Sequence, residues 1–98
     1  MLKDFRSYQL AVRLHRSCEG VAAKYYVRDQ LLRASLSVVL NLAEGSERAT
    51  RKDQQRLYNI AMASAREVQA LLDLIGNAKL IQLADEVGAC LWRLTHPR

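Results

Sequence analysis

The sequence predicts an all-α protein: an up-down-up-down antiparallel four-helix bundle, built as one domain over residues 1–98. Half of the residues are hydrophobic but only 6% are aromatic, and four glycines and one proline leave little material for the turns of a β protein. Apolar residues recur at spacings of three and four through four segments. The segments are joined by short connections, which make neighbouring helices antiparallel.

The first two helices differ in how much of their circumference is apolar. We expect the first from about Asp4 to about Tyr26, with Gly20 inside it, and the second from about Asp29 to about Ser46. The first has one apolar face, whereas the second is apolar over roughly two thirds of its circumference. A small bundle buries one face of each helix, so the excess indicates a subunit interface. The expected interface residues in this helix are Leu32, Leu36, Val39 and Leu40.

The third helix has a clear start and a clear stop. Thr50 is followed three residues later by Asp53, a capping signature, and Gly76-Asn77 fits a C-terminal stop. The fourth helix is expected to be short, from about Leu83 to Thr95. Trp92 lies opposite its core face, which is more typical of an interface residue than of a binding platform.

The formal charge is +5, from 15 Lys and Arg against 10 Asp and Glu, and 11 of the 15 are arginine. This excess of positive charge fits either a solvated surface or a polyanionic partner. Binding to a phosphate backbone needs clustered cations without a fixed spacing. One cluster lies on the first helix and one between the second and third helices; the candidate nucleic-acid-binding residues are Arg6, Arg13, Arg16, Arg48, Arg51, Lys52 and Arg56.

No pattern in the sequence predicts catalysis, a cofactor, a metal or a small-molecule substrate. His15 and Cys18 are one turn apart, but a structural zinc would need two more ligands and only Cys90 is a natural third. We expect both cysteines to be reduced, buried thiols. Glu44 and Glu67 could form a carboxylate pair, although structural partners such as Arg33 or Arg66 are favoured. The residues expected to have structural polar roles are Arg33, Asn41, Glu44 and Glu67.

The first ten residues, MLKDFRSYQL, contain charges and no apolar segment, which is unlike a signal peptide. No stretch approaches the roughly 20 apolar residues of a membrane-spanning helix. We therefore expect a cytoplasmic protein.

Two runs resemble the four-helix-bundle family of 23S rRNA intervening-sequence proteins. The family run Q-L-x-R-A-x-x-S-I-x-x-N-I-A-E-G is matched over residues 30–45. The later run I-A-x-G-S-x-x-E is matched over residues 60–67, with Ala63 in place of glycine. The resemblance covers about residues 3–75. The chain departs from the family in lacking a tryptophan in the first helix, in its short first connection and in its short fourth helix.

The resemblance implies a homopentameric ring with a basic surface. It also implies a partner class, because related proteins are accessory factors of diversity-generating retroelements that engage a reverse transcriptase and nucleic acid. The leading hypothesis is a non-enzymatic, homo-oligomeric basic bundle that binds RNA or DNA through phosphate contacts. The alternative is an accessory scaffold that binds a reverse transcriptase together with nucleic acid.

Overall fold

The computed structural model describes residues 2–97 and confirms the all-α, four-helix prediction, with no strand among these residues. A 3-10 turn, η1, opens the described chain. The elements are η1 (Leu2–Asp4), α1 (Arg6–Cys18), α2 (Tyr25–Ser46), α3 (Arg51–Ile75) and α4 (Ala78–Thr95).

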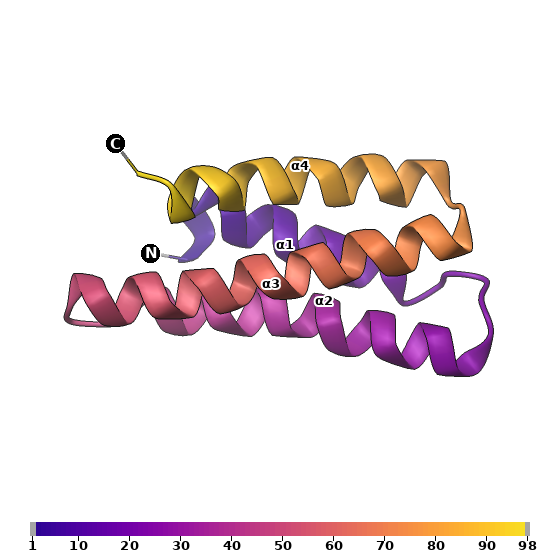
Figure 1. Ribbon diagram of the computed structural model, residues 1–98, viewed down its shortest axis with the longest axis horizontal. Coiled ribbons are helices and arrows are strands. Elements are labelled where there is room, and N and C mark those ends of the chain that lie inside the picture. The colour runs from indigo at the N-terminus through magenta and orange to yellow at the C-terminus, as the bar shows by residue number, and fades with distance from the viewer. Residues whose placement is uncertain (1, 98) are drawn as a thin grey trace.

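Successive helices run in opposite directions along the long axis of a body measuring 40 × 22 × 21 Å (Figure 1). Both α1 and α3 pack mainly against α2 and α4, so each helix has two principal neighbours. The 25 residues of α3 would extend about 37 Å at 1.5 Å per residue, nearly the whole long axis. The turn between α2 and α3 projects beyond the ends of α1 and α4 (Figure 1).

The core is a single cluster of aliphatic side chains that all four helices supply. Alanines on three helices are almost fully buried and allow the helix backbones to approach closely. The fully buried larger side chains are Leu14, Leu31, Val38, Leu42, Val68, Leu72, Val87 and Leu91.

The predicted boundary between the first two helices is wrong. The first helix ends at Cys18, not near Tyr26, and the second begins at Tyr25, not at Asp29. Val21 explains the error, because this residue of the connecting segment is only 4% exposed and continues the apolar spacing of α1 without being helical. Gly20 consequently lies outside the helix.

The end of α3 and the start of α4 are joined by two residues, Gly76 and Asn77. Gly76 adopts the left-handed conformation (φ 81°), as the predicted stop requires. The side chain of Asn77 then accepts a hydrogen bond from Leu80 N at 3.0 Å and caps α4. The predicted start near Leu83 is therefore wrong, and the fourth helix has 18 residues.

The start of α3 is confirmed. Thr50 has extended backbone angles, and its hydroxyl oxygen accepts a hydrogen bond from Asp53 N at 3.1 Å. None of the helices in residues 2–97 has the length and hydropathy that crossing a bilayer requires.

Candidate nucleic-acid interface

Three of the predicted arginines lie along α1 and are exposed. Arg6 and Arg13 are seven residues apart, so they lie within about 20° of each other around the helix. Arg16 is about 60° away from Arg13 by the same arithmetic. By the same arithmetic the opposite side of α1 carries Ala11 and Cys18, which are fully buried in the core. The three guanidinium groups therefore form one basic strip on the outside of α1.

The other four predicted cations lie at the projecting turn between α2 and α3. Arg48 is in the turn, and Arg51, Lys52 and Arg56 are in the first turns of α3; all four are exposed. Lys52 and Arg56 are four residues apart and share a line on α3, while Arg51 is about 100° from Lys52. We call these four residues the hairpin cluster.

The seven predicted cations lie in the two groups that the sequence predicts, one on α1 and one at the α2–α3 turn. Arg6 lies near the hairpin end, since Phe5 and Tyr58 line a hollow there together with Ser46 and Glu47. Arg13 and Arg16 lie farther along α1, whose main neighbours are α2 and α4 and not α3.

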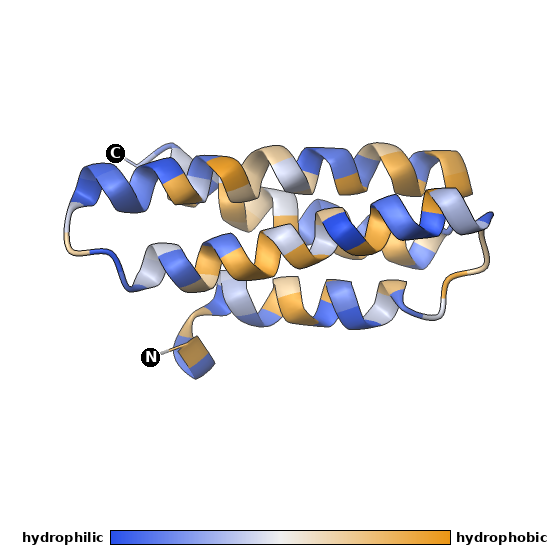
Figure 2. Cartoon of the chain, turned by 90° about the horizontal axis from the view of Figure 1, so that it is seen from below, coloured by the Kyte–Doolittle hydropathy of each residue, from blue (hydrophilic) through white to orange (hydrophobic). Residues whose placement is uncertain are grey.

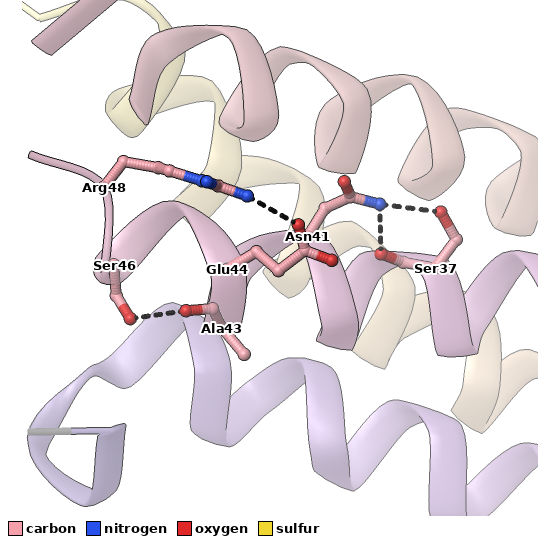
Figure 3. Close-up of polar contacts among 6 residues, drawn as sticks. All are labelled: Ser37, Asn41, Ala43, Glu44, Ser46 and Arg48. Atoms are coloured by element: carbon pink, nitrogen blue, oxygen red, sulfur yellow. Dashed lines mark hydrogen bonds and ion pairs between the residues drawn. The ribbon is translucent and has the colours of Figure 1, made fainter. Parts of the chain in front are cut away.

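Only one of the seven cations is neutralised by an ion pair in residues 2–97. Arg48 Nη2 lies 3.1 Å from Glu44 Oε2, four residues earlier, and both side chains are about half exposed (Figure 3). Exposed pairs of this kind contribute less than about 1 kcal/mol to stability. The remaining six side chains are charged, exposed and free to contact phosphate.

Glu44 lies in the last turn of α2, next to Gly45, and the packing of this turn against α3 depends on that glycine. A Cβ atom at Gly45 would lie 2.6 Å from Tyr58 Cε1 and 2.8 Å from Tyr58 Cδ1, so the ring of Tyr58 packs directly on the glycine backbone. Gln54 Nε2 also donates a hydrogen bond to Gly45 O at 3.1 Å. The glycine in the sequence AEG is therefore a packing contact between α2 and α3 and not part of a phosphate loop.

The hairpin end is a well-packed region. Tyr58 is 7% exposed, burial raises its pKa, and its ring centroid lies 6.0 Å from that of Phe5. Ser46 Oγ donates to Ala43 O at 2.7 Å in the last turn of α2 (Figure 3). These contacts hold the backbone that carries the hairpin cluster.

The two sequence runs that resemble the family, residues 30–45 and 60–67, meet at the interface between α2 and α3. Ser37, from the first run, has its Oγ 2.7 Å from Oγ of Ser64, from the second run. Asn41 Nδ2 donates to Ser37 O at 2.9 Å and to Ser37 Oγ at 3.1 Å (Figure 3). These hydrogen bonds link the partly buried polar groups of the two helices, so the runs describe how a helical hairpin packs.

The other predicted polar residues have simpler surroundings. Arg33 and Glu67 are exposed, and neither forms an ion pair within residues 2–97. Arg66 donates to Gln69 Oε1 at 2.9 Å, and Gln69 Nε2 donates to Asp85 Oδ1 at 3.1 Å. Glu44 has an arginine partner, as expected, but within residues 2–97 that partner is Arg48 and not Arg33 or Arg66.

The predicted interface residues fall on two different faces. Leu36 is 42% exposed and Leu40 is 50% exposed, on the outer side of α2, which runs through the middle of Figure 2. Ile60 on the neighbouring α3 is 40% exposed, a contribution that the sequence pattern did not single out. Leu32 and Val39 are half-buried and pack against the core.

Trp92 occupies the second face, on α4. It is 49% exposed and its ring stacks on His96 with centroids 4.1 Å apart and an interplanar angle of 10°. A shallow hollow beside it is lined by Arg66, Gln69, Asp85, Gly88, Ala89 and Arg93.

The side chains considered as metal ligands, His15, Cys18 and Cys90, have contacts typical of structural residues. His15 Nδ1 lies 2.7 Å from Oγ of the buried Ser35, which also donates to Leu32 O at 3.3 Å. Both cysteines are free; Cys18 is buried, and Cys90, expected to be buried, is only partly buried at the edge of the core. Burial raises the pKa of the Cys18 thiol to about 11. In residues 2–97 no three His, Cys, Asp or Glu side chains are grouped as metal ligands.

The fold and these surfaces define a class: small antiparallel four-helix bundles with exposed arginines and a tightly packed α2–α3 hairpin. The family profile of the 23S rRNA-intervening sequence proteins matches residues 4–90, and the chain belongs to that family. No curated protein and no solved structure shows a significant match to it.

Proposed function

We propose that the protein is a non-enzymatic, homo-oligomeric basic bundle that binds RNA or DNA mainly through phosphate contacts. The observation that supports this most directly is the exposure of six predicted cations without a carboxylate partner. The family description names ribosomal RNA intervening sequences, which agrees with a nucleic-acid association. Arginine suits this role because its planar guanidinium makes forked contacts with phosphate.

The proposed assembly is a closed ring, with five copies as the expected number. A ring needs two different complementary surfaces on each copy, because its contacts are head-to-tail. The exposed leucines of α2 and the Trp92 surface of α4 supply two such surfaces on separate faces. Five copies at +5 would carry a formal charge of about +25, which attracts polyanions strongly at low salt.

Binding is tested by fluorescence anisotropy with a labelled RNA and a labelled DNA over a range of salt concentrations. Affinity should fall steeply with salt and depend little on sequence, with a log–log slope of about −0.7 for each phosphate contact on a single strand. Salt-insensitive binding, or no binding at low salt, would contradict the proposal.

Two charge-matched variants identify the contacting group. One replaces Arg6, Arg13 and Arg16 with Gln; the other replaces Arg51, Lys52 and Arg56 with Gln. The group that contacts phosphate should show the greater loss of affinity and a shallower salt slope. The control replaces Lys3 and Lys79 with Gln, which removes exposed charges outside both groups and outside the Trp92 surface. Equal losses per charge removed in all three variants would indicate an effect of net charge alone.

Assembly is tested separately with Leu40→Glu. Leu40 is half exposed in one copy, so the change should leave the helical fold intact and lower the mass measured by light scattering. The control Gln82→Glu places the same charge at an exposed position of α4. A stable monomer for the unmodified chain at low concentration would refute the ring.

The second candidate is an accessory scaffold that binds a reverse transcriptase together with nucleic acid. The exposed apolar side chains of Leu36 and Leu40 on α2 and of Ile60 on α3 favour a protein contact, either with a second copy or with such an enzyme. An adjacent reverse-transcriptase gene and its co-purification with the bundle would support this candidate. Purification from the native host without a polymerase would count against it.

A further inference from the structure

Two adjacent tyrosines at the start of α2 are exposed and take no part in the core. Tyr25 is 74% exposed and Tyr26 is 57% exposed. Their rings lie edge to face, with centroids 5.7 Å apart and an interplanar angle of 88°. Because both side chains remain largely in water, the fold does not require their large aromatic surfaces.

Tyr26 stands between two hollows in the surface. The first, of about 360 Å³, is lined by Tyr26 with Asp29, Gln30, Leu32 and Arg33. The second, of about 390 Å³, is lined by Tyr26 with Ala22, Ala23, Lys24, Val27, Leu74 and Ile75. Tyr26 therefore presents surface to both hollows, and a flat ligand could contact its ring from either one.

The two hollows differ in chemistry. The first carries an amide, a carboxylate and a guanidinium, which together donate and accept hydrogen bonds. The second has an apolar floor, to which the 78% exposed Leu74 contributes, and a lysine. In the segment from Lys24 to Arg33 there are three cations and one carboxylate, Asp29. An aromatic ring with polar edge groups and neighbouring cations matches a nucleotide with its base unstacked.

We propose that Tyr25 and Tyr26 form a stacking platform for unpaired nucleobases, so that the preferred ligand is single-stranded nucleic acid. Lys24 and Arg28 would contact its phosphates, and Gln30 and Arg33 the edges of its bases. This inference rests on the proposed nucleic-acid binding and adds the class of ligand. A duplex hides the faces of its bases within the stack and cannot use the platform in this way.

The platform is separate from the hairpin cluster. α2 has 22 residues, so its two ends are about 33 Å apart. Changes at the tyrosines therefore leave the hairpin cations in place, and the contributions of stacking and of charge can be measured independently.

The test compares anisotropy of a labelled single-stranded RNA of about 20 nucleotides with a duplex of the same length, at about 50 mM salt. Tyr26→Ala and Tyr26→Leu should weaken single-strand binding by roughly fivefold to a hundredfold, whereas duplex binding stays unchanged. Tyr26→Phe retains the ring and should bind like the unmodified chain. Tyr26→Phe and Tyr26→Leu are the matched pair, because they differ in the π system. Leu74→Ala removes apolar surface from the second hollow without removing a π system, so it measures the apolar contribution of that hollow separately from stacking.

The outcomes separate this inference from the proposed function. If the unmodified chain binds neither probe, nucleic-acid binding itself fails and the platform fails with it. If the chain binds in a manner that needs the arginines but Tyr26→Leu binds the single strand normally, only the platform is refuted. Equal losses for Tyr26→Ala and Leu74→Ala in self-association or protein capture, with RNA binding unchanged, would assign the patch to a protein contact and overturn it.

Discussion

Replacement of Gly45 by alanine tests the structure most directly, because two opposing effects meet at this position. Alanine is favoured over glycine in a helix by up to about 1 kcal/mol, and the backbone of Gly45 is not left-handed, so conformation alone would make the change stabilising. The added Cβ, however, would lie 2.6 Å from Tyr58 Cε1 and 3.4 Å from Leu57 Cβ. The sign of the effect depends on whether Tyr58 can move.

Burial limits how far Tyr58 can move, and the ring borders open space only on the side of the hollow that it lines with Phe5. Its ring is 7% exposed and packs beside Phe5, and the approaching atoms belong to the ring and not to the end of a flexible chain. Overpacking of a well-packed site typically costs about 1–3 kcal/mol. Subtraction of a helix-propensity gain of up to about 1 kcal/mol leaves a central expectation that Gly45→Ala lowers the free energy of unfolding by about 1 kcal/mol, and by about 2 kcal/mol at the upper end.

The assay is urea and thermal unfolding followed by circular dichroism, at one protein concentration because an oligomer's stability depends on it. A loss of this size corresponds to about 4–16 °C in Tm for a chain of this length. Gly20→Ala is the control: a Cβ there meets nothing within 4 Å, so the variant should be neutral or slightly more stable.

A double-mutant cycle isolates the contact with Tyr58. In a Tyr58→Leu background, Gly45→Ala should cost much less than in the unmodified chain, because the obstructing ring is absent. Unchanged or increased stability of Gly45→Ala in the unmodified chain would refute the close approach of α2 and α3 and its role in holding the hairpin cluster.

Two further predictions concern local features. Thr50→Ala removes the acceptor for Asp53 N and should lower the free energy of unfolding by about 1 kcal/mol, whereas Thr50→Ser keeps a hydroxyl and should retain most of the stability. Equal unfolding midpoints for both variants would contradict the cap. The pKa of the Cys18 thiol is about 11 in the folded chain and near its ordinary value of 9.0 in the unfolded chain. Between these pH values the unfolded chain therefore binds fewer protons than the folded chain. The free energy of unfolding should consequently fall by about 2–3 kcal/mol as the pH rises from about 9 to 11. Unfolding of Cys18→Ala in urea should show a shallower fall, and parallel curves for the two proteins would exclude the thiol as the cause.

Local signals in the sequence were sufficient for several features of the fold. The period of apolar residues predicts four helices, and the start at Thr50 and the stop at Gly76 follow from hydrogen bonds and backbone conformation within a few residues. The boundary near Val21 could not be predicted in this way, because a buried residue in a loop fits the apolar spacing as well as a buried residue in a helix does.

The sequence by itself therefore determined the helical class, the cap at Thr50, the stop at Gly76, the family and the two clusters of cations. Only the tertiary structure decided which residues from different helices touch. It joins Ser37 to Ser64, packs Tyr58 on Gly45 and leaves Tyr26 between two hollows. The physical reason is that capping and periodicity depend on neighbours in the chain, whereas exposure and contact depend on helices that are distant in sequence and adjacent in space.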